Sequence, residues 1–516
     1  MKDRIGLKIA QYPGSELDNN KEPDNVAIKL YGRRFHKDQT PVEYLAEFLL
    51  VFCSAKGEDG QNEYSFSVPL GSARYWPKGR LPLKLFSFFS TSKLETRHPI
   101  HHQSYIEALD RLKDRVDGSN SDRDDAVTLL QSLFSGFVGV SKNRTWVTHS
   151  FLPGSSELLS REIDWAHSVA IKSDITNWTE AAAYFSTDRH NFMARGGELL
   201  FLQLSNLFSQ PFTLPPMCDS TTYRHLTRRP IPIVRERIEN GLKAELIKAA
   251  PALDALSRFI DRTLNEFDFD GSDRPASLGW VPAESTPEAF LFACEIDNII
   301  GSSLGSLEKL DLMKQLCCLH VLRTLCFQAK RYDQSDRTTT GFSGNYAWVV
   351  SDINAPKSDP TRMLSQKSLS GIEEMLFRVL RVVAQQYPGQ SNFSEADKHG
   401  FQIFRKIAKE IELVVPKTGQ GARFALTPKL LRLLVATLLE PNEKVRLTEF
   451  YRRVFAHYGI ALGGTQQAEA LRWDGADYRS TDYAVAVQTT WVEEALRQGA
   501  LLVELSDAVS IVHNPS

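Results

Sequence analysis

The C-terminal stretch 427–516 carries the pattern that most constrains the fold of this chain. Thr427 and Pro428 are typical of a helix start, and Gly459 and Gly499 each follow an apolar helical pattern and are typical of a helix end. In order, the pattern predicts helices over 427–439, 448–458 and 483–498 and then a two-stranded hairpin over 501–512. Three helices followed by a hairpin are the order of a winged helix, so the stretch predicts that fold.

Winged helices bind DNA or proteins, and the charges of this stretch leave both interpretations open. It carries nine Lys and Arg against eleven Asp and Glu, and its hairpin holds Glu504 and Asp507 without a basic residue. Because duplex affinity depends mainly on phosphate neutralisation, this balance does not favour DNA. If DNA is bound, we expect the third helix in the groove, with phosphate contacts from exposed arginines and base contacts from threonines. These candidates are Arg452, Arg453, Arg497, Thr489 and Thr490.

Length and composition indicate an ordinary globular chain. A chain of 516 residues is expected to form roughly two to four domains. The formal net charge of -2 gives no general attraction to nucleic acid or membrane. The N-terminal residues do not resemble a signal peptide, no apolar run is long enough to cross a membrane, and the six cysteines show no disulfide pattern. We therefore expect a cytoplasmic protein with reduced thiols and no membrane partner.

Apolar patterning divides the chain into several parts. Alternation predicts strands at 5–9 and 26–31, whereas amphipathic segments further along, such as 156–170, predict helices. Polar, turn-rich stretches at 268–287 and 417–421 are linker candidates. The predicted fold class is mixed and mainly α, with an α+β N-terminal domain, a helical middle region and a C-terminal winged helix. The predicted domains are 1–152 (α+β), 153–270 (helical), 288–415 (second helical region) and 422–516 (winged helix).

Motifs of common enzymes are absent from the sequence. It has no phosphate-binding loop, dinucleotide fingerprint, His-Glu-x-x-His motif or Gly-x-Ser-x-Gly elbow, so we expect no cofactor and favour a non-catalytic protein. A metal-dependent nuclease would need carboxylates that converge on adjacent strands. The acidic groups with a nearby histidine fall instead in predicted helices, where helix-start acids and surface pairs are common. They are Glu162, Asp164 and His167, and Asp188, His190 and Glu198.

Histidine and cysteine spacing gives no metal site. One histidine group lacks the cysteine pair that would complete a zinc site, and we interpret it as a solvated turn: His98, His101 and His102. A second group lies within one apolar helix, where a free cysteine packs as a small apolar side chain. We interpret this group as core: Cys317, Cys318, His320 and Cys326.

Two local basic stretches stand out from the neutral total. The first, between residues 71 and 103, interleaves basic and aromatic side chains, which suits phosphate contact and base stacking. The alternative is that the rings fill the core of a strand and the charges form its solvated side. The second stretch, 224–248, is diluted by glutamates. The nucleic-acid-binding candidates from the two stretches are Arg74, Lys78, Arg80, Arg228 and Arg229.

Three stretches carry a family resemblance: Leu30–Arg34, Asp38–Leu49 and the C-terminal winged helix. They resemble bacterial antiphage-defence proteins, in particular the accessory component encoded beside a large ATPase in systems such as the methylation-associated defence system. The resemblance implies a non-catalytic subunit that senses DNA or couples an ATPase to other defence proteins. It assigns no catalytic residue.

These observations lead to three hypotheses. The first is a non-catalytic DNA-binding or adaptor subunit of a multi-protein bacterial antiphage defence system, working with a separate ATPase. The alternatives are a metal-dependent nuclease or other effector with an unrecognised active site, and a purely structural scaffold. Because 417–421 is predicted to be a linker, deletion of 422–516 is expected to leave a folded remainder.

Overall fold

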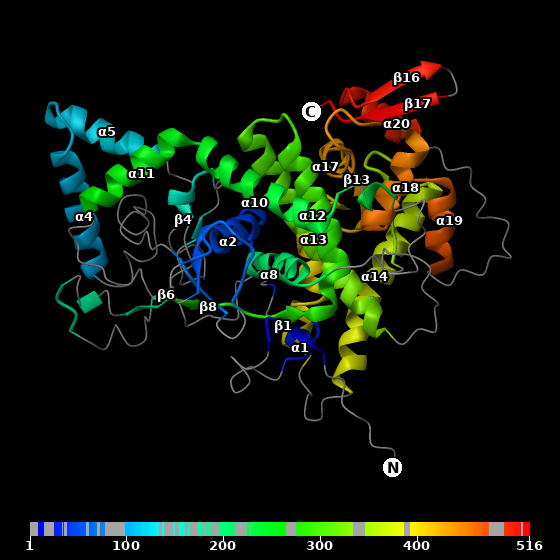
Figure 1. Cartoon of the computed structure of the whole chain (residues 1–516), viewed down its shortest axis with the longest axis horizontal. Coiled ribbons are helices and arrows are strands. Elements are labelled where there is room, and N and C mark those ends of the chain that lie inside the picture. The colour runs from blue at the N-terminus through cyan, green and yellow to red at the C-terminus, as the bar shows by residue number, and fades with distance from the viewer. Residues whose placement is uncertain are drawn as a thin grey trace, which may run out of the picture. The chain divides into compact units, whose positions relative to one another are not determined.

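The computed structural model of this chain is mainly helical, which confirms the predicted mainly α class (Figure 1). Its strands are short and form sheets of two or three. The structure describes residues 9–14, 25–32, 35, 39–57, 61–69, 73–77, 99–133, 137–138, 148–149, 154–159, 164–165, 174–177, 180–181, 184–186, 196–211, 224–227, 229–264, 275–333, 346–385, 393–473, 490–506 and 509–515.

The chain forms two compact units, and each gathers segments that are distant in sequence. The first unit contains residues 1–41, 202–241 and 279–516. The second unit contains residues 42–201 and 242–278. The four sequence-derived domains remain a prediction.

The second unit combines helices with very short strands. Its elements are α2 (Pro41–Cys53), β2 (Ala55–Lys56), β3 (Arg74–Trp76), α4 (Pro99–Asp114), α5 (Asn120–Leu133), β4 (Phe137–Val138), β5 (Thr148–His149), η2 (Ser156–Leu158), β6 (Asp164–Trp165), β7 (Phe185–Ser186), the start of α8 (Gly196–Ser209), the end of α10 (Ile231–Lys248), α11 (Pro251–Leu264) and β8 (Ala276–Ser277). Strands β2, β3 and β8 form an antiparallel sheet with β3 in the middle.

Aromatic packing on α2 organises the core of the second unit. The ring of Phe66 lies 5.1 Å from that of Phe52 and 5.4 Å from that of Phe201, measured between centroids. The α2 helix ends beside the buried Lys56, whose Nζ donates to the carbonyl oxygens of Phe52 and Ser54. A lysine here satisfies carbonyls that the end of a helix leaves without an intrahelical partner.

Two secondary-structure predictions in the N-terminal half are wrong. Residues 26–31 form helix α1 rather than a strand, because the Asn25 side chain caps it and its apolar residues are buried around most of its circumference. Residues 156–170 do not form one helix. The chain makes one turn at η2, and Asp164–Trp165 then pair antiparallel with Phe185–Ser186. Apolar periodicity alone does not separate these alternatives in short buried segments.

The first unit contains the long helices of the protein. Its elements before residue 400 are β1 (Gln11–Tyr12), α1 (Val26–Tyr31), the remainder of α8, η3 (Arg224–Thr227), most of α10, β9 (Val281–Pro282), η4 (Ala283–Ser285), α12 (Thr286–Gly301), α13 (Ser306–Tyr332), β10 (Trp348–Val349), β11 (Ser351–Asp352), α14 (Pro360–Ala384) and α15 (Ser394–Lys398). Strands β1 and β9 pair antiparallel.

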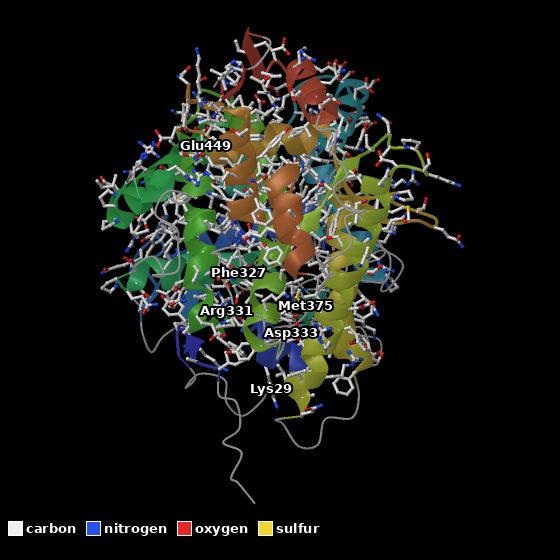
Figure 2. All side chains as sticks on the ribbon, turned by 90° about the vertical axis from the view of Figure 1, so that its right-hand side faces the viewer. Lys29, Phe327, Arg331, Asp333, Met375 and Glu449 are labelled. Atoms are coloured by element: carbon white, nitrogen blue, oxygen red, sulfur yellow. The ribbon has the colours of Figure 1, made fainter. Side chains whose placement is uncertain are left out.

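Helix α13 runs through the core of the first unit. Its residues from Leu316 to Cys326 are all buried. Helix α14 packs against it, as seen in Figure 2, where Phe327 marks α13 and Met375 marks α14. At the end of α13, Arg331 forms an ion pair with the buried Glu288 of α12. A helix that is buried around its whole circumference requires neighbours on all sides, and α12, α14 and α16 (Phe401–Glu410) pack against it.

The C-terminal part of the first unit contains the predicted helices and hairpin. Its elements are α16 (Phe401–Glu410), β12 (Val414–Val415), β13 (Arg423–Leu426), α17 (Pro428–Leu438), β14 (Lys444–Arg446), α18 (Leu447–Tyr458), β15 (Ile460–Ala461), α19 (Gly464–Trp473), α20 (Thr490–Gln498), β16 (Leu502–Ser506) and β17 (Val509–His513). The Thr427 hydroxyl caps α17, and Gly459 ends α18 with a left-handed φ of 70°. Both end signals predicted from the sequence are confirmed.

Two sheets join the C-terminal elements to the middle of the chain. Strand β13 lies between β11, to which it is parallel, and β12, to which it is antiparallel. Strand β15 pairs in parallel with β10. Because these ladders cross the predicted linker 417–421, a deletion that starts at residue 422 removes the central strand of a sheet. Such a deletion leaves β11 and β12 without their shared partner, which argues against a folded remainder.

Within the described residues, none of the helices combines the length and the apolar character that crossing a membrane requires.

Candidate functional site

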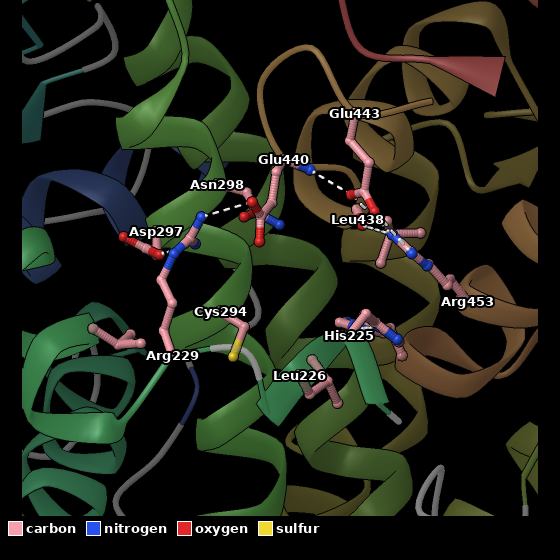
Figure 3. A pocket seen from close by; sticks show the side chains of 12 residues that line it. His225, Leu226, Arg229, Cys294, Asp297, Asn298, Leu438, Glu440, Glu443 and Arg453 are labelled. Atoms are coloured by element: carbon pink, nitrogen blue, oxygen red, sulfur yellow. Dashed lines mark hydrogen bonds and ion pairs between the residues drawn. The ribbon is translucent and has the colours of Figure 1, made fainter. Parts of the chain in front are cut away.

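A polar pocket lies in the first unit where η3 and α10 meet α12, α17 and α18 (Figure 3). Its cavity volume of about 30 Å³ suits a few water molecules. Charged and polar side chains dominate the lining, which consists of His225, Leu226, Arg229, Val234, Cys294, Asp297, Asn298, Leu438, Glu440, Glu443, Arg453 and His457.

Arg229 connects α12 and the end of α17 across one side of the pocket (Figure 3). Its Nη1 lies 2.6 Å from Asp297 Oδ2, and its Nη2 lies 3.0 Å from Glu440 Oε2. Arg237 donates to the other oxygen of the same aspartate at 2.6 Å. The predicted phosphate ligand Arg229 therefore has two carboxylate partners within the protein. Arg228 lies outside the described residues.

Arg453 fills another side of the pocket (Figure 3) and is only 4% exposed. Its guanidinium contacts Glu443 at 2.9 Å and Glu449 at 2.9 Å, and it also donates to the Leu438 carbonyl. Burial alone would lower the pKa of Arg453, but the two glutamates outweigh burial and raise it. The expectation that Arg453 is exposed for DNA is wrong, because it shares a helix face with Glu449 and His457 and that face is turned inward.

The neighbouring Arg452 is half-buried and pairs with Glu449 at 2.6 Å. Burial would raise the pKa of Glu449, but Arg452 and Arg453 together hold it below its usual value. Glu449 thus remains ionised between two arginines, and Figure 2 marks its place on α18.

A buried network lies behind the pocket and starts at Glu295 of α12. Arg323 of α13 makes a bidentate contact with the Glu295 carboxylate, at 2.6 and 2.9 Å, and donates to the His457 carbonyl at 3.2 Å. His457 Nδ1 lies 2.9 Å from Glu295 Oε1. The side chains of Glu295 and Arg323 are fully buried and that of His457 is nearly so. This network attaches α18 to both α12 and α13.

Burial and the neighbouring groups together determine the protonation states of Glu295 and His457. Burial would raise the pKa of Glu295, but the Arg323 charge and hydrogen bonds from His457 and Arg323 outweigh it and lower that pKa. Burial lowers the pKa of His457 and outweighs the opposing effect of Glu295. A neutral His457 therefore donates from Nδ1 to Glu295, and its Nε2 accepts from His225 Nε2, 2.9 Å away.

His320 extends the network on the far side of Arg323. Its Nδ1 accepts from Arg323, at 3.1 Å from Nε and 2.9 Å from Nη2, because a guanidinium can only donate. Its Nε2 then donates to Gln203 Oε1 at 2.9 Å. Burial, reinforced by the Arg323 charge, holds the pKa of His320 well below its usual value. His320 is thus a neutral, hydrogen-bonded core histidine.

The pocket is lined by polar groups, as enzyme active sites are, but its lining offers no activated nucleophile. Glu295 and His457 are arranged as a carboxylate and an oriented histidine, but the pocket lining contains no hydroxyl for them to activate. Cys294 is the thiol at the pocket, and burial, with the charges of Glu295 and Asp297, raises its pKa and keeps it protonated. Within the described residues, no three His, Cys, Asp or Glu side chains are grouped to hold a metal ion.

The other described candidates for DNA contact fall in both units, with Arg74 in the second unit and Thr490 and Arg497 in the first. Arg74 is exposed on β3, whereas Lys78 and Arg80 lie outside the described residues. Thr490 is exposed at the start of α20, and Thr489 lies outside the described part of the chain. Arg497 is about half-exposed and forms ion pairs with Glu494 and Glu504.

The structure describes two of the six catalytic candidates. Glu198 is buried in the first turn of α8, and Asp164 lies in β6. The remaining four lie outside the described residues: Glu162, His167, Asp188 and His190. Of the three histidines interpreted as a solvated turn, His102 is exposed on α4.

The core interpretation of the cysteines is confirmed, because Cys317, Cys318 and Cys326 are each fully buried. Sequence reasoning missed the charged network beside them. Glu295 and Arg323 both lie inside otherwise apolar helical segments, and a charged residue in such a position is rarely buried without a partner. The sequence therefore indicates that Glu295 and Arg323 each need a charged or polar partner, but it does not identify that partner.

Comparison with protein-family models, with curated proteins and with solved structures found no match to this chain.

Proposed function

We propose that this chain is a non-catalytic adaptor subunit of a multi-protein bacterial antiphage defence system. In this proposal its C-terminal elements form a winged helix that binds a protein partner, and the protein acts in the cytoplasm with a separate ATPase. The defence system and the ATPase rest on the family resemblance of the sequence. The role of the winged helix rests on the arrangement of its elements and on the pairing of its arginines.

The order and pairing of the C-terminal elements support a winged helix. Helix α17, strand β14 and helix α18 are followed by α20 and by the hairpin of β16 and β17. Strand β17 lies between β14 and β16, and both pairs are antiparallel. Three helices and a three-stranded sheet in this order are the arrangement of a winged helix, with α19 as an addition between its second and third helices.

The outer surface of this arrangement is formed by α20 and β16, which lie side by side (Figure 1). Val492 and Leu496 of α20 are buried, whereas Thr490, Glu494 and Arg497 are exposed. Glu504 of β16 is exposed beside them and pairs with Arg497. We call these four exposed residues the α20 surface. It carries two carboxylates and one guanidinium.

The single observation that carries the protein-binding proposal is the pairing of the arginines. Arg452 and Arg453 pair with glutamates, and so does Arg497 on the α20 surface. A phosphate backbone would have to displace these carboxylates, and the acidic groups would repel it. A protein partner with a basic patch meets complementary charge at the same place.

The test is co-purification of the chain with the ATPase that the family resemblance implies as its partner. Wild-type protein is expected to retain the ATPase, and the charge reversal Glu494→Lys with Glu504→Lys is expected to release it while circular dichroism stays unchanged. Arg405→Glu is a matched control in the same unit, since Arg405 is also about half-exposed and paired with a glutamate. Retention by the reversed variant would refute the proposed surface.

DNA binding is the second candidate, favoured by the exposed Arg74 on β3 and the exposed Thr490 on α20. It predicts measurable affinity for a duplex that weakens steeply with salt. In fluorescence anisotropy with labelled duplex DNA, Arg74→Ala would then reduce the affinity and flatten the salt dependence by about one unit per lost phosphate contact. The adaptor proposal predicts no such affinity at physiological salt.

A further inference from the structure

Arg423 of β13 differs from the other buried arginines of the described residues. Three described arginines are buried: Arg323, Arg423 and Arg453. Arg323 and Arg453 each contact a carboxylate. The Arg423 guanidinium donates only to uncharged oxygens, namely Ser351 Oγ at 3.2 Å, the Ile353 carbonyl at 2.7 Å and, more weakly, the Asp352 carbonyl at 3.5 Å. A cation is therefore held inside the protein without an anionic contact.

A second arginine reaches the same turn. Arg362, in the first turn of α14, donates from Nη1 to the Ala355 carbonyl at 2.7 Å. Arg362 and Arg423 thus both bind carbonyl oxygens of the turn 352–355, which leads from β11 into α14. The first turn of α14 contains no acidic residue, and the Asp359 carboxylate caps the helix just before it.

The two aspartates near this turn accept backbone hydrogen bonds and form no ion pair with Arg362 or Arg423. Asp352 Oδ1 accepts from the backbone N–H of Asn354, and Asp359 Oδ1 accepts from that of Thr361. Burial lowers the pKa of Arg423, and repulsion from Arg362 lowers it further, with Asp352 opposing them. For Arg323 and Arg453, in contrast, carboxylates raise the pKa. The direction of the pKa shift therefore distinguishes Arg423, which lacks a counter-charge, from Arg323 and Arg453, which have one.

We propose that Arg362 and Arg423 form a binding site for a phosphate group. Within the described residues, Arg423 Nη1 and Arg362 Nε and Nη2 make no hydrogen bond, and planar guanidinium groups with free N–H donors match phosphate oxygens. Arg423 is only 4% exposed, which favours a small ligand over the backbone of a duplex. The ligand is therefore inorganic phosphate or the terminal phosphate of a mononucleotide.

The site is tested by isothermal titration of the full chain with inorganic phosphate and with adenosine 5′-monophosphate, at constant ionic strength maintained with chloride. Saturable binding of either probe is expected. Binding of phosphate alone identifies the free ion as the ligand, and tighter binding of the nucleotide identifies the ester. Arg362→Gln is expected to weaken binding about tenfold or more, since it removes a charged donor from a site that holds two.

Arg378→Gln is the matched control, because Arg378 is an exposed arginine of the same helix that already pairs with Asp333. It is expected to bind the probe as wild type does. Arg423→Lys keeps the charge but loses the planar group, so it is expected to weaken binding with an unchanged circular dichroism spectrum. The absence of binding to wild type at millimolar concentrations of both probes would overturn the proposal. Wild-type affinity in folded Arg362→Gln would overturn it as well.

Discussion

Two arginine and glutamate clusters of the first unit have the same chemistry and opposite surroundings. In the buried cluster, Arg323 and Glu295 are fully buried and share their hydrogen bonds with His457. In the exposed cluster, Arg497 pairs with Glu494 and Glu504, and all three side chains are about half-exposed. Removing one member of a buried ion pair leaves the other charge buried with neither a partner nor water around it. Breaking an exposed pair only returns the charges to solvent. The buried cluster therefore attaches α18 to its neighbours, and the exposed cluster is the surface proposed for recognition.

The largest expected effect is that of removing the C-terminal segment. Deletion of 422–516 takes away His457 of the buried cluster and the central strand β13, and it uncovers the side of α12 on which α17 packs. We expect a remainder that does not fold cooperatively. Thermal unfolding followed by circular dichroism is the measurement. A sharp transition close to that of the full chain would show that the segment is an independent domain, as the sequence first suggested.

Arg323→Met is expected to be the most destabilising single substitution among those considered. It leaves the fully buried Glu295 without its guanidinium partner, and the loss of unfolding free energy should be about 3–5 kcal/mol. Urea denaturation measures it. The double variant Arg323→Met with Glu295→Gln removes both charges and should be more stable than the sum of the single effects implies. Strict additivity would contradict the direct coupling of the two groups.

Arg453 gives a smaller effect, because its glutamate partners are partly exposed to water. Arg453→Gln should lower the unfolding free energy by about 2–3 kcal/mol, between the values typical of exposed and fully buried pairs. The adjacent Arg452→Gln should cost about 1 kcal/mol or less, because that side chain is more exposed. Equal losses in urea denaturation would mean that the two arginines have the same surroundings.

Stability should fall as the pH drops from about 7 toward 5, because His320 and His457 stay neutral in the folded protein. Their pKa values are lowered by burial, so the unfolded chain takes up protons below the usual histidine pKa of about 6.5 and the folded chain does not. Each histidine contributes a slope of about 1.4 kcal/mol per pH unit. The lowered pKa of Glu295 adds no slope in this window, since its contribution is lost only at more acidic pH.

Urea denaturation at several pH values between 5 and 7.5 measures this slope. His320→Asn should flatten the dependence, and the exposed His102→Asn should leave it unchanged. Equal slopes for wild type and His320→Asn would show that His320 is protonated in the folded state.

The smallest effect on stability is expected at the exposed cluster. Arg497→Gln should leave the urea midpoint unchanged, because both glutamate partners return to water. A clear loss of stability in this variant would show that the α20 surface is structural, and the contrast between the two clusters would fail.

Local end signals were the part of the fold that the sequence predicted well. Thr427 caps α17, and Gly459 ends α18 in the left-handed conformation. This position requires glycine, because a side chain there would also collide with the Tyr346 carbonyl. Residues 26–31 were predicted wrongly as a strand, because their burial on most sides is set by neighbours distant in sequence.

The buried cluster could not be assembled from the sequence. Glu295, Arg323 and His457 come from three helices, and only the fold brings them together. The inward position of Arg453 was predictable in part, since it lies three residues after the apolar Phe450 and therefore on the same side of the helix. This inward position also depends on His457, four residues later, and on its partner Glu295.

Hydrogen exchange with mass spectrometry, recorded with and without the ATPase proposed as partner and with duplex DNA, tests the central claim most directly. Slow exchange of α18 is expected in every sample, because the buried cluster holds that helix. Added ATPase is expected to slow exchange in α20 and β16 alone, and DNA is expected to change nothing. Protection of α20 by DNA but not by the ATPase, or fast exchange of α18 in the free protein, would contradict the account.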